Sequence, residues 1–145
     1  MAFQFSLAAV LRVRGILEER EERMLQKILF EISQSFEALA QIDAEISGTN
    51  ASRRAEILRP VVGHQIHVSY GEVKELKQKR IDVLDRIEKL EQLRDKQLIL
   101  YEKARRNREM LTDMRDEKRS AYDSDLARSE QKTLDDNYIA RRGLN

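Results

Sequence analysis

The chain has 145 residues, of which 37% are charged, one is proline, five are glycine and none is cysteine or tryptophan. This composition favours long helices with a mostly hydrated surface over a globular core, and the lack of cysteine excludes disulfides and thiolate zinc sites. The formal net charge of +1 creates no overall field that would select nucleic acid or an anionic membrane.

The first residues, MAFQFSLAAVLRVR, do not have the features of a secretory signal. No basic residue precedes the apolar run, and Arg12 and Arg14 interrupt it early. No stretch reaches the roughly 18 uncharged apolar residues that a membrane span needs. We therefore expect a soluble, cytoplasmic protein.

A first helix is predicted over about residues 3–47, possibly continuing to 59. Its heptad seam consists of Leu25, Ile32, Leu39 and Ile46, with Ile28 and Ile42 at the second apolar position. Upstream, Val10, Leu17 and Met24 are spaced by seven but one position out of phase. This offset predicts a slip of the repeat near residues 24–28.

Helix breakers then gather over about residues 48–69, where Gly48, Asn50, Pro60 and Gly63 predict the turn of the molecule. The same region holds the only two histidines, His64 and His67. With no cysteine and no indicated third ligand, we interpret them as solvated loop residues and predict no metal site.

A second helix is predicted over about residues 70–142. One heptad position carries Leu76, Val83, Leu90, Gln97, Ala104 and Leu111. The other carries Ile87, Tyr101 and Tyr122, alternating with Arg80, Arg94, Arg108 and Arg115. Seam arginines weaken a core and disfavour a tight homodimer. The expected fold class is all-α: a single two-helix antiparallel coiled-coil hairpin whose C-terminal helix is the longer one.

The two helices differ in length, so part of the second should have no partner. If Ile46 lies opposite Val73, residue 3 faces roughly residue 116, and about 25 residues extend beyond it. The heptad fades in the same region, and a charged helix of that length is marginal in water by itself. We expect this segment to fray or to be held by another protein.

Catalytic chemistry finds no support in the sequence. Adjacent carboxylates such as Asp135 and Asp136 point about 100° apart on a helix, and no phosphate-binding loop, nucleophile elbow or Cys/His arrangement occurs. The basic run at residues 103–108 is followed by acidic residues within two turns. We predict no enzyme, no cofactor, no small-molecule substrate and no nucleic-acid partner.

Both ends of the chain carry distinctive patterns. At the N-terminus, Phe3, Phe5 and Leu7 form an aromatic-x-aromatic-x-Leu pattern, followed by Leu11 and Arg14. Near the C-terminus, Glu130 to Lys132 are followed by Leu134, Asp135 and Asp136, and then by a basic tail. These two patterns resemble the opening and closing segments of the flagellar export protein FliJ family. The middle of the chain matches any coiled coil.

The resemblance implies a non-enzymatic central stalk of the flagellar type III export ATPase. Such a stalk would sit in the pore of the hexameric ATPase ring, promote ring assembly and activity, and contact the export gate membrane protein and export chaperones. It would be cytoplasmic and peripherally associated with the membrane-embedded export apparatus. Candidate ring contacts are Arg12, Arg14, Arg128, Lys132, Asp135, Asp136, Arg141 and Arg142. Candidate contacts for the gate or chaperones are Phe36, Leu39 and Tyr70.

Three other functions remain open. A self-associating scaffold would be expected to have uninterrupted apolar seams, which Arg80, Arg94 and Arg108 contradict. A prefoldin-like chaperone would need apolar residues at both open ends; the N-terminal end allows this, but the charged tail argues against it. The equivalent stalk of a virulence-type secretion system would have the same physical features.

Overall fold

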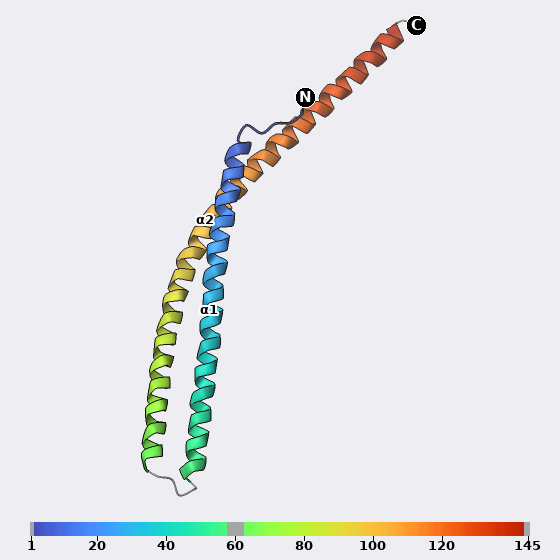
Figure 1. The fold of residues 1–145 in the computed structure, drawn as a ribbon. Coiled ribbons are helices and arrows are strands. Elements are labelled where there is room, and N and C mark those ends of the chain that lie inside the picture. Colours follow the sequence, from blue (N-terminus) through green and yellow to red (C-terminus); the bar gives the residue numbers. More distant parts are fainter. Residues whose placement is uncertain (1, 58–62, 144–145) are drawn as a thin grey trace. The chain divides into compact units, whose positions relative to one another are not determined.

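A computed structural model describes residues 2–57 and 63–143, with side chains in the second range from Tyr70 onward. Two helices account for nearly all of them: α1 spans Ala8–Ile57 and α2 spans Gly63–Gly143. The helices pack antiparallel as an all-α hairpin, and α2 is the longer one, as the sequence predicts (Figure 1). Residues 58–62, where part of the turn was expected, lie outside the described residues.

The chain divides into two compact units. Unit 1 contains residues 1–21 and 101–145, and unit 2 contains residues 22–100. Unit 2 holds most of the buried apolar side chains, namely Leu25, Ile32, Val73, Ile87 and Leu90. In unit 1 only Phe5, among the described residues, is an apolar side chain of comparable burial.

The residues that face the partner helix form the seam, and in α1 it follows one unbroken heptad phase. Leu11, Glu18, Leu25, Ile32, Leu39 and Ile46 are each buried or half-buried at intervals of seven. The predicted slip near residues 24–28 is wrong, because Val10, Leu17 and Met24 are 42%, 42% and 46% exposed. The prediction assumed apolar seam residues, whereas the seam carries charged residues in this stretch.

The predicted seam of α2 is confirmed. Val73, Ile87 and Leu90 are buried, the seam arginines Arg80 and Arg94 are half-buried, and Gln97 is only 5% exposed. A polar amide at such a position weakens the core relative to leucine.

The helix boundaries differ from the predicted ones near the turn. α1 continues to Ile57, within the possible extension to 59, and α2 already begins at Gly63, so the two helices cover most of the region 48–69 that was expected as a turn. Gly48 and Gly71 lie inside helices with no positive φ. A glycine in a helix costs about 1 kcal/mol, which is too little to end a helix that has a packing partner.

The beginning of α1 also differs, since the helix starts at Ala8 rather than at residue 3. Residues 2–7, the N-terminal segment, precede it without helical structure and run along α2 within unit 1 (Figure 1). The chain enters the helix through backbone hydrogen bonds from Ala8 N to the Phe5 carbonyl and from Leu11 N to the Leu7 carbonyl, of 3.1 and 2.9 Å.

Candidate protein-binding surfaces

The last part of α2 is exposed on all sides in the described chain. Residues 123–143, here called the overhang, are all exposed, including Leu134, Tyr138 and Ile139 at 63%, 64% and 66%. Six predicted ring contacts lie on it and are exposed: Arg128, Lys132, Asp135, Asp136, Arg141 and Arg142. At 100° per residue, five of these charges, all but Arg141, lie within an arc of about 120° on one face of the helix.

The heptad explains where the overhang begins. Tyr122 is the last half-buried residue of α2, and the following seam positions are Asp125, Ser129, Lys132 and Asp136. Polar side chains at these positions would not bury apolar area against a second helix. The sequence therefore ends the packing at Tyr122, although the helix itself continues.

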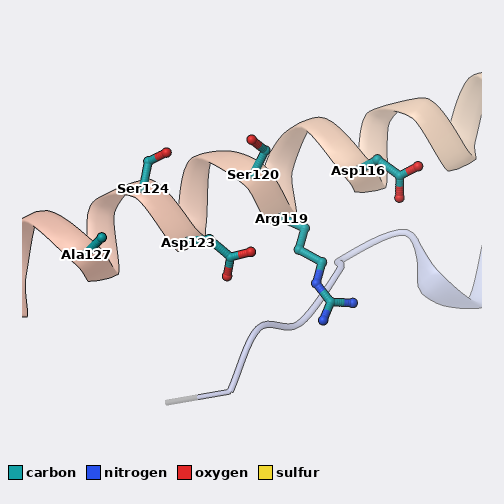
Figure 2. Close-up of a pocket in the computed structure, with 6 residues that line it drawn as sticks. All are labelled: Asp116, Arg119, Ser120, Asp123, Ser124 and Ala127. Atoms are coloured by element: carbon teal, nitrogen blue, oxygen red, sulfur yellow. The ribbon is translucent and has the colours of Figure 1, made fainter.

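The overhang's described side-chain hydrogen bonds are local. Gln131 donates to Asp135 at 3.1 Å, and Thr133 donates to the Ser129 carbonyl at 3.0 Å. Figure 2 shows the shallow face at the base of the overhang, where Arg119 reaches toward the N-terminal segment while Ser120 and Ser124 point away from it. All six residues that line this face belong to α2, so it is an open surface of one helix.

The N-terminal segment clamps α2 just before the overhang. The rings of Phe3 and Tyr122 lie 5.6 Å apart at their centroids, and the Lys118 ammonium lies 5.6 Å from the Phe5 ring. Phe3 thus contacts residue 122, not residue 116 as predicted. A non-helical chain advances up to about 3.3 Å per residue against about 1.5 Å for a helix, so it reaches further along α2. The aromatic pattern of the N-terminus therefore has a packing role.

The seam of unit 1 contains an ion pair. Arg108 donates hydrogen bonds from Nε and from a terminal guanidinium nitrogen to the two Glu18 carboxylate oxygens, the second at 3.2 Å. The side chains are 32% and 15% exposed. The hydrogen bond to Glu18 raises the pKa of Arg108, against a smaller opposing effect of desolvation.

The two predicted ring contacts near the start of α1 are placed differently. Arg12 is exposed and accessible to a partner. Arg14 is half-buried at a seam position, one turn before Glu18, and so presents less of its surface. Sequence reasoning missed the polar character of this stretch; the signal was the continuation of the Leu25 phase back to Glu18 and Leu11.

Only part of the predicted gate or chaperone surface is accessible. Phe36 and Tyr70 are 47% and 54% exposed. Leu39 is half-buried in the seam, so it presents less of its side chain to a partner than the other two. The Tyr70 ring carries the Arg53 guanidinium at 4.0 Å from its centroid, a cation–π contact between the two helices.

Three further predictions concern the two histidines, metal binding and membrane spans. The side chains of His64 and His67 lie outside the described residues. Within the described part of the chain, no group of three or more histidine, aspartate or glutamate residues is placed to hold a metal ion. None of the helices, over its described residues, is apolar enough over a sufficient length to cross a membrane.

A basic groove in unit 2 was not predicted. It lies between the end of α1 and the beginning of α2 and includes Arg53, Arg54, Lys74 and Lys77. These residues are some twenty positions apart in the sequence and meet only through the hairpin. The sequence indicated this groove only through the close spacing of basic residues within each helix, at 53–54 and at 74–77.

Searches with the chain against protein-family models, curated proteins and solved structures found no match.

Proposed function

We propose that this chain is a non-enzymatic central stalk of the flagellar type III export ATPase, which promotes assembly and activity of the hexameric ring. In this proposal it also contacts the export gate and export chaperones at the cytoplasmic face of the export apparatus. The resemblance of both chain ends to the FliJ family motivates the assignment. Exposure of the overhang is the structural observation that supports it best.

The overhang has physical properties that suit a ring pore. At about 1.5 Å per residue, its 21 helical residues extend on the order of 30 Å beyond the last packed residue. Charges of both signs lie along it, with five acidic and four basic side chains over residues 123–143. Contacts between such a helix and pore loops would be numerous, individually weak and able to change during turnover.

The stalk would act without chemistry of its own. A bound protein shifts a conformational equilibrium only by as much as its affinities for the alternative states differ. If the overhang and Arg12 bind one arrangement of the ring better than others, the stalk favours that arrangement. A faster ATPase cycle would follow when the favoured arrangement lies on the rate-limiting path.

The test is the ATP hydrolysis rate of the flagellar export ATPase from the same organism, measured alone, with the full chain and with a chain ending at Tyr122. We expect stimulation by the full chain and its loss on truncation. Truncation at this residue removes only the overhang and the terminal residues, so the seam stays complete. A helical circular dichroism spectrum of the truncated chain controls for folding.

A second pair of variants separates a charge effect from a length effect. Arg141→Glu with Arg142→Glu reverses charge on the overhang, and Lys89→Glu with Lys96→Glu makes the same change on exposed positions of unit 2. Only the first pair should reduce stimulation. No stimulation by the full chain, with a ring shown to assemble, would contradict the stalk proposal. Stimulation that survives truncation would still support the ATPase as the partner, but it would refute the role of the overhang.

One observation favours a second candidate, a chaperone that grips unfolded clients at the open end of the hairpin. Val10, Val13, Ile16 and Leu17 form an exposed apolar stripe on α1, with exposures between 42% and 58%. This function predicts that the chain suppresses aggregation of a denatured client such as reduced insulin. Suppression lost in Val13→Ser with Leu17→Ser, and retained on truncation at Tyr122, would favour it over the stalk.

A further inference from the structure

The groove at the turn end of unit 2, here called the tip groove, combines positive charge with exposed apolar surface. Four of its lining residues are basic: Arg53 and Arg54 from α1, and Lys74 and Lys77 from α2. The apolar part of the lining is formed by Ile57, Tyr70 and Val73. Ile57 and Tyr70 are 63% and 54% exposed, whereas Val73 is part of the buried seam.

The charges of the groove are not balanced from within. No carboxylate lines it, and Arg54, Lys74 and Lys77 form no ion pair with a described residue. Arg54 lies in the last turn of α1, where a cation interacts favourably with the helix dipole. That effect accounts for one cation, not for four that converge from two helices.

Arg53 has a different role from the other three cations. Its guanidinium stacks on the Tyr70 ring at 4.0 Å, which links α1 to α2 across the groove. A stacked guanidinium retains its outward N–H donors for a carboxylate, and its position is more ordered than that of a free surface side chain. The groove thus offers one oriented fork of donors beside three cations that form no ion pair with a described residue.

We propose that the tip groove docks a short acidic segment of a partner protein that carries apolar side chains between its carboxylates. The carboxylates would pair with Arg53, Arg54, Lys74 and Lys77, and an apolar side chain would cover Ile57 and Tyr70. This inference is independent of the proposed ring contacts, which lie in unit 1, whereas the groove lies in unit 2 and shares Tyr70 with the surface proposed for the gate or chaperones.

Charge distribution around the groove favours a short acidic peptide over a nucleic acid. Glu56, Glu72 and Glu75 lie on the same helix segments outside the groove lining and would repel a polyanion that runs past it. The net charge of the chain is only +1, so the chain as a whole has no positive field that would favour a long polyanion. The exposed Ile57 also matches an apolar side chain better than a phosphate backbone.

The experiment measures binding of the full chain to a fluorescent peptide of alternating glutamate pairs and leucines, followed by anisotropy at low salt. The comparison probes are the same peptide with glutamine for glutamate and a single-stranded oligonucleotide of equal charge. Arg54→Glu with Lys77→Glu reverses charge in the groove; Lys79→Glu with Lys103→Glu makes an equal change at exposed residues outside it. Thermal unfolding checks that all variants fold.

We expect the acidic peptide to bind, the glutamine peptide to bind much more weakly, and added salt to weaken the binding. Exposed ion pairs contribute up to about 1 kcal/mol each, so the groove variant should lose about tenfold in affinity while the control pair changes it less than about twofold. Ile57→Ser should also weaken the acidic peptide. Equal losses in groove and control variants would overturn the proposal, as would stronger binding of the oligonucleotide through the same residues.

These outcomes are separable from those of the ATPase test. Failure of the acidic peptide to bind leaves stimulation of the ATPase unaffected, and a chain that binds the peptide without stimulating any ATPase supports the groove alone. Charge reversal in the groove is therefore expected to leave stimulation by the full chain intact.

Discussion

At the level of single residues, charged side chains occupy seam positions that coiled coils usually fill with apolar ones. Arg108 and Glu18 form the least exposed ion pair among those found between described residues. Their bidentate geometry favours the pair over a single-contact bridge. Arg80 and Asp43 form a comparable inter-helix pair at 2.8 Å, but with 43% and 49% of their side chains exposed.

A double-mutant cycle on Arg108→Gln and Glu18→Gln should give a coupling of about 1 kcal/mol, between the values typical of exposed and buried pairs. The cycle on Arg80→Gln and Asp43→Asn is the matched control and should give less than about 0.5 kcal/mol. Urea unfolding followed by circular dichroism measures both. A larger coupling for the exposed pair would contradict the assignment of the stronger interaction to the seam of unit 1.

The pH dependence of this contribution follows from the raised pKa of Arg108. A group whose pKa is higher in the folded state stabilises the protein fully below its unfolded pKa and loses that effect only as the pH rises through the folded value. Arginine titrates above about 12, so the stability difference between wild type and Arg108→Gln should stay constant from about pH 6 to about pH 10. A decline within that interval, measured by urea unfolding, would show that another group controls the pair.

At the level of elements, the two helices keep one heptad phase each through residues that ordinarily break helices. Gly48 lies in α1 with nothing within 4 Å of the position that a Cβ would take, and its φ is negative. A glycine in such a position lowers the stability of the fold only because it raises the backbone entropy of the unfolded chain. The helix continues through it because the seam residues around it, Ile46 and Thr49, remain packed.

Gly48→Ala should therefore raise the free energy of unfolding by about 0.5 to 1 kcal/mol. Gly71→Ala, in the same environment on α2, should do the same, and the two gains should add because the side chains are too small to interact. Chemical unfolding of the two single variants and the double variant measures this. Destabilisation by Gly48→Ala would indicate that residue 48 belongs to a turn, as the sequence alone suggested.

The N-terminal segment stabilises the adjacent part of α2 through Phe5, the most buried apolar side chain of unit 1, at 9% exposure. Phe5→Ala should cost about 2 kcal/mol locally. Amide exchange in residues 111–122 should accelerate by about 30-fold, the equivalent of that energy. Phe36→Ala, at 47% exposure, is the control and should leave these amides unchanged. Equal exchange in both variants would contradict a clamp.

Sequence patterns predicted the elements well where apolar spacing is regular and poorly where it is not. The α2 seam from Val73 to Leu111 follows from its heptads alone, seam arginines included. The phase of α1 before Leu25 does not, because Glu18 is held in the seam by Arg108, a residue of the other helix. The tip groove was unpredictable for the same reason, because it depends on contacts between segments far apart in the sequence. The end of α1 at Ile57, by contrast, lies within the possible extension to 59 that the sequence predicted.

At the level of the whole molecule, helix and packing end at different places. α2 continues to Gly143, whereas its last half-buried residue is Tyr122. An isolated helix of this length and charge is marginal in water, so its helical content depends on a partner. The sequence predicted such an unpartnered end about six residues too early, since it placed residue 3 in a helix.

Truncation at Tyr122 should change the thermal unfolding midpoint by less than about 2 °C, because the removed residues pack against nothing else in the described chain. Amides of the overhang should exchange orders of magnitude faster than those of Ile87 and Leu90. Adding the proposed ATPase ring should protect them. A clear fall in the midpoint on truncation would mean that the overhang contributes to folding.

The uneven seam also has a mechanical consequence. Between Arg14 and Glu21 the seam of unit 1 depends on ionic side chains, whereas Leu25 and Ile32 begin an apolar stretch in unit 2. Ionic contacts weaken with salt and apolar burial does not. If the two chain ends were pulled apart in an optical trap, the hairpin should unzip in two steps. The first step should occur at lower force, and its force should change with salt concentration. The force of the second step should not change with salt. The protein would therefore unfold at its open end well before its closed end.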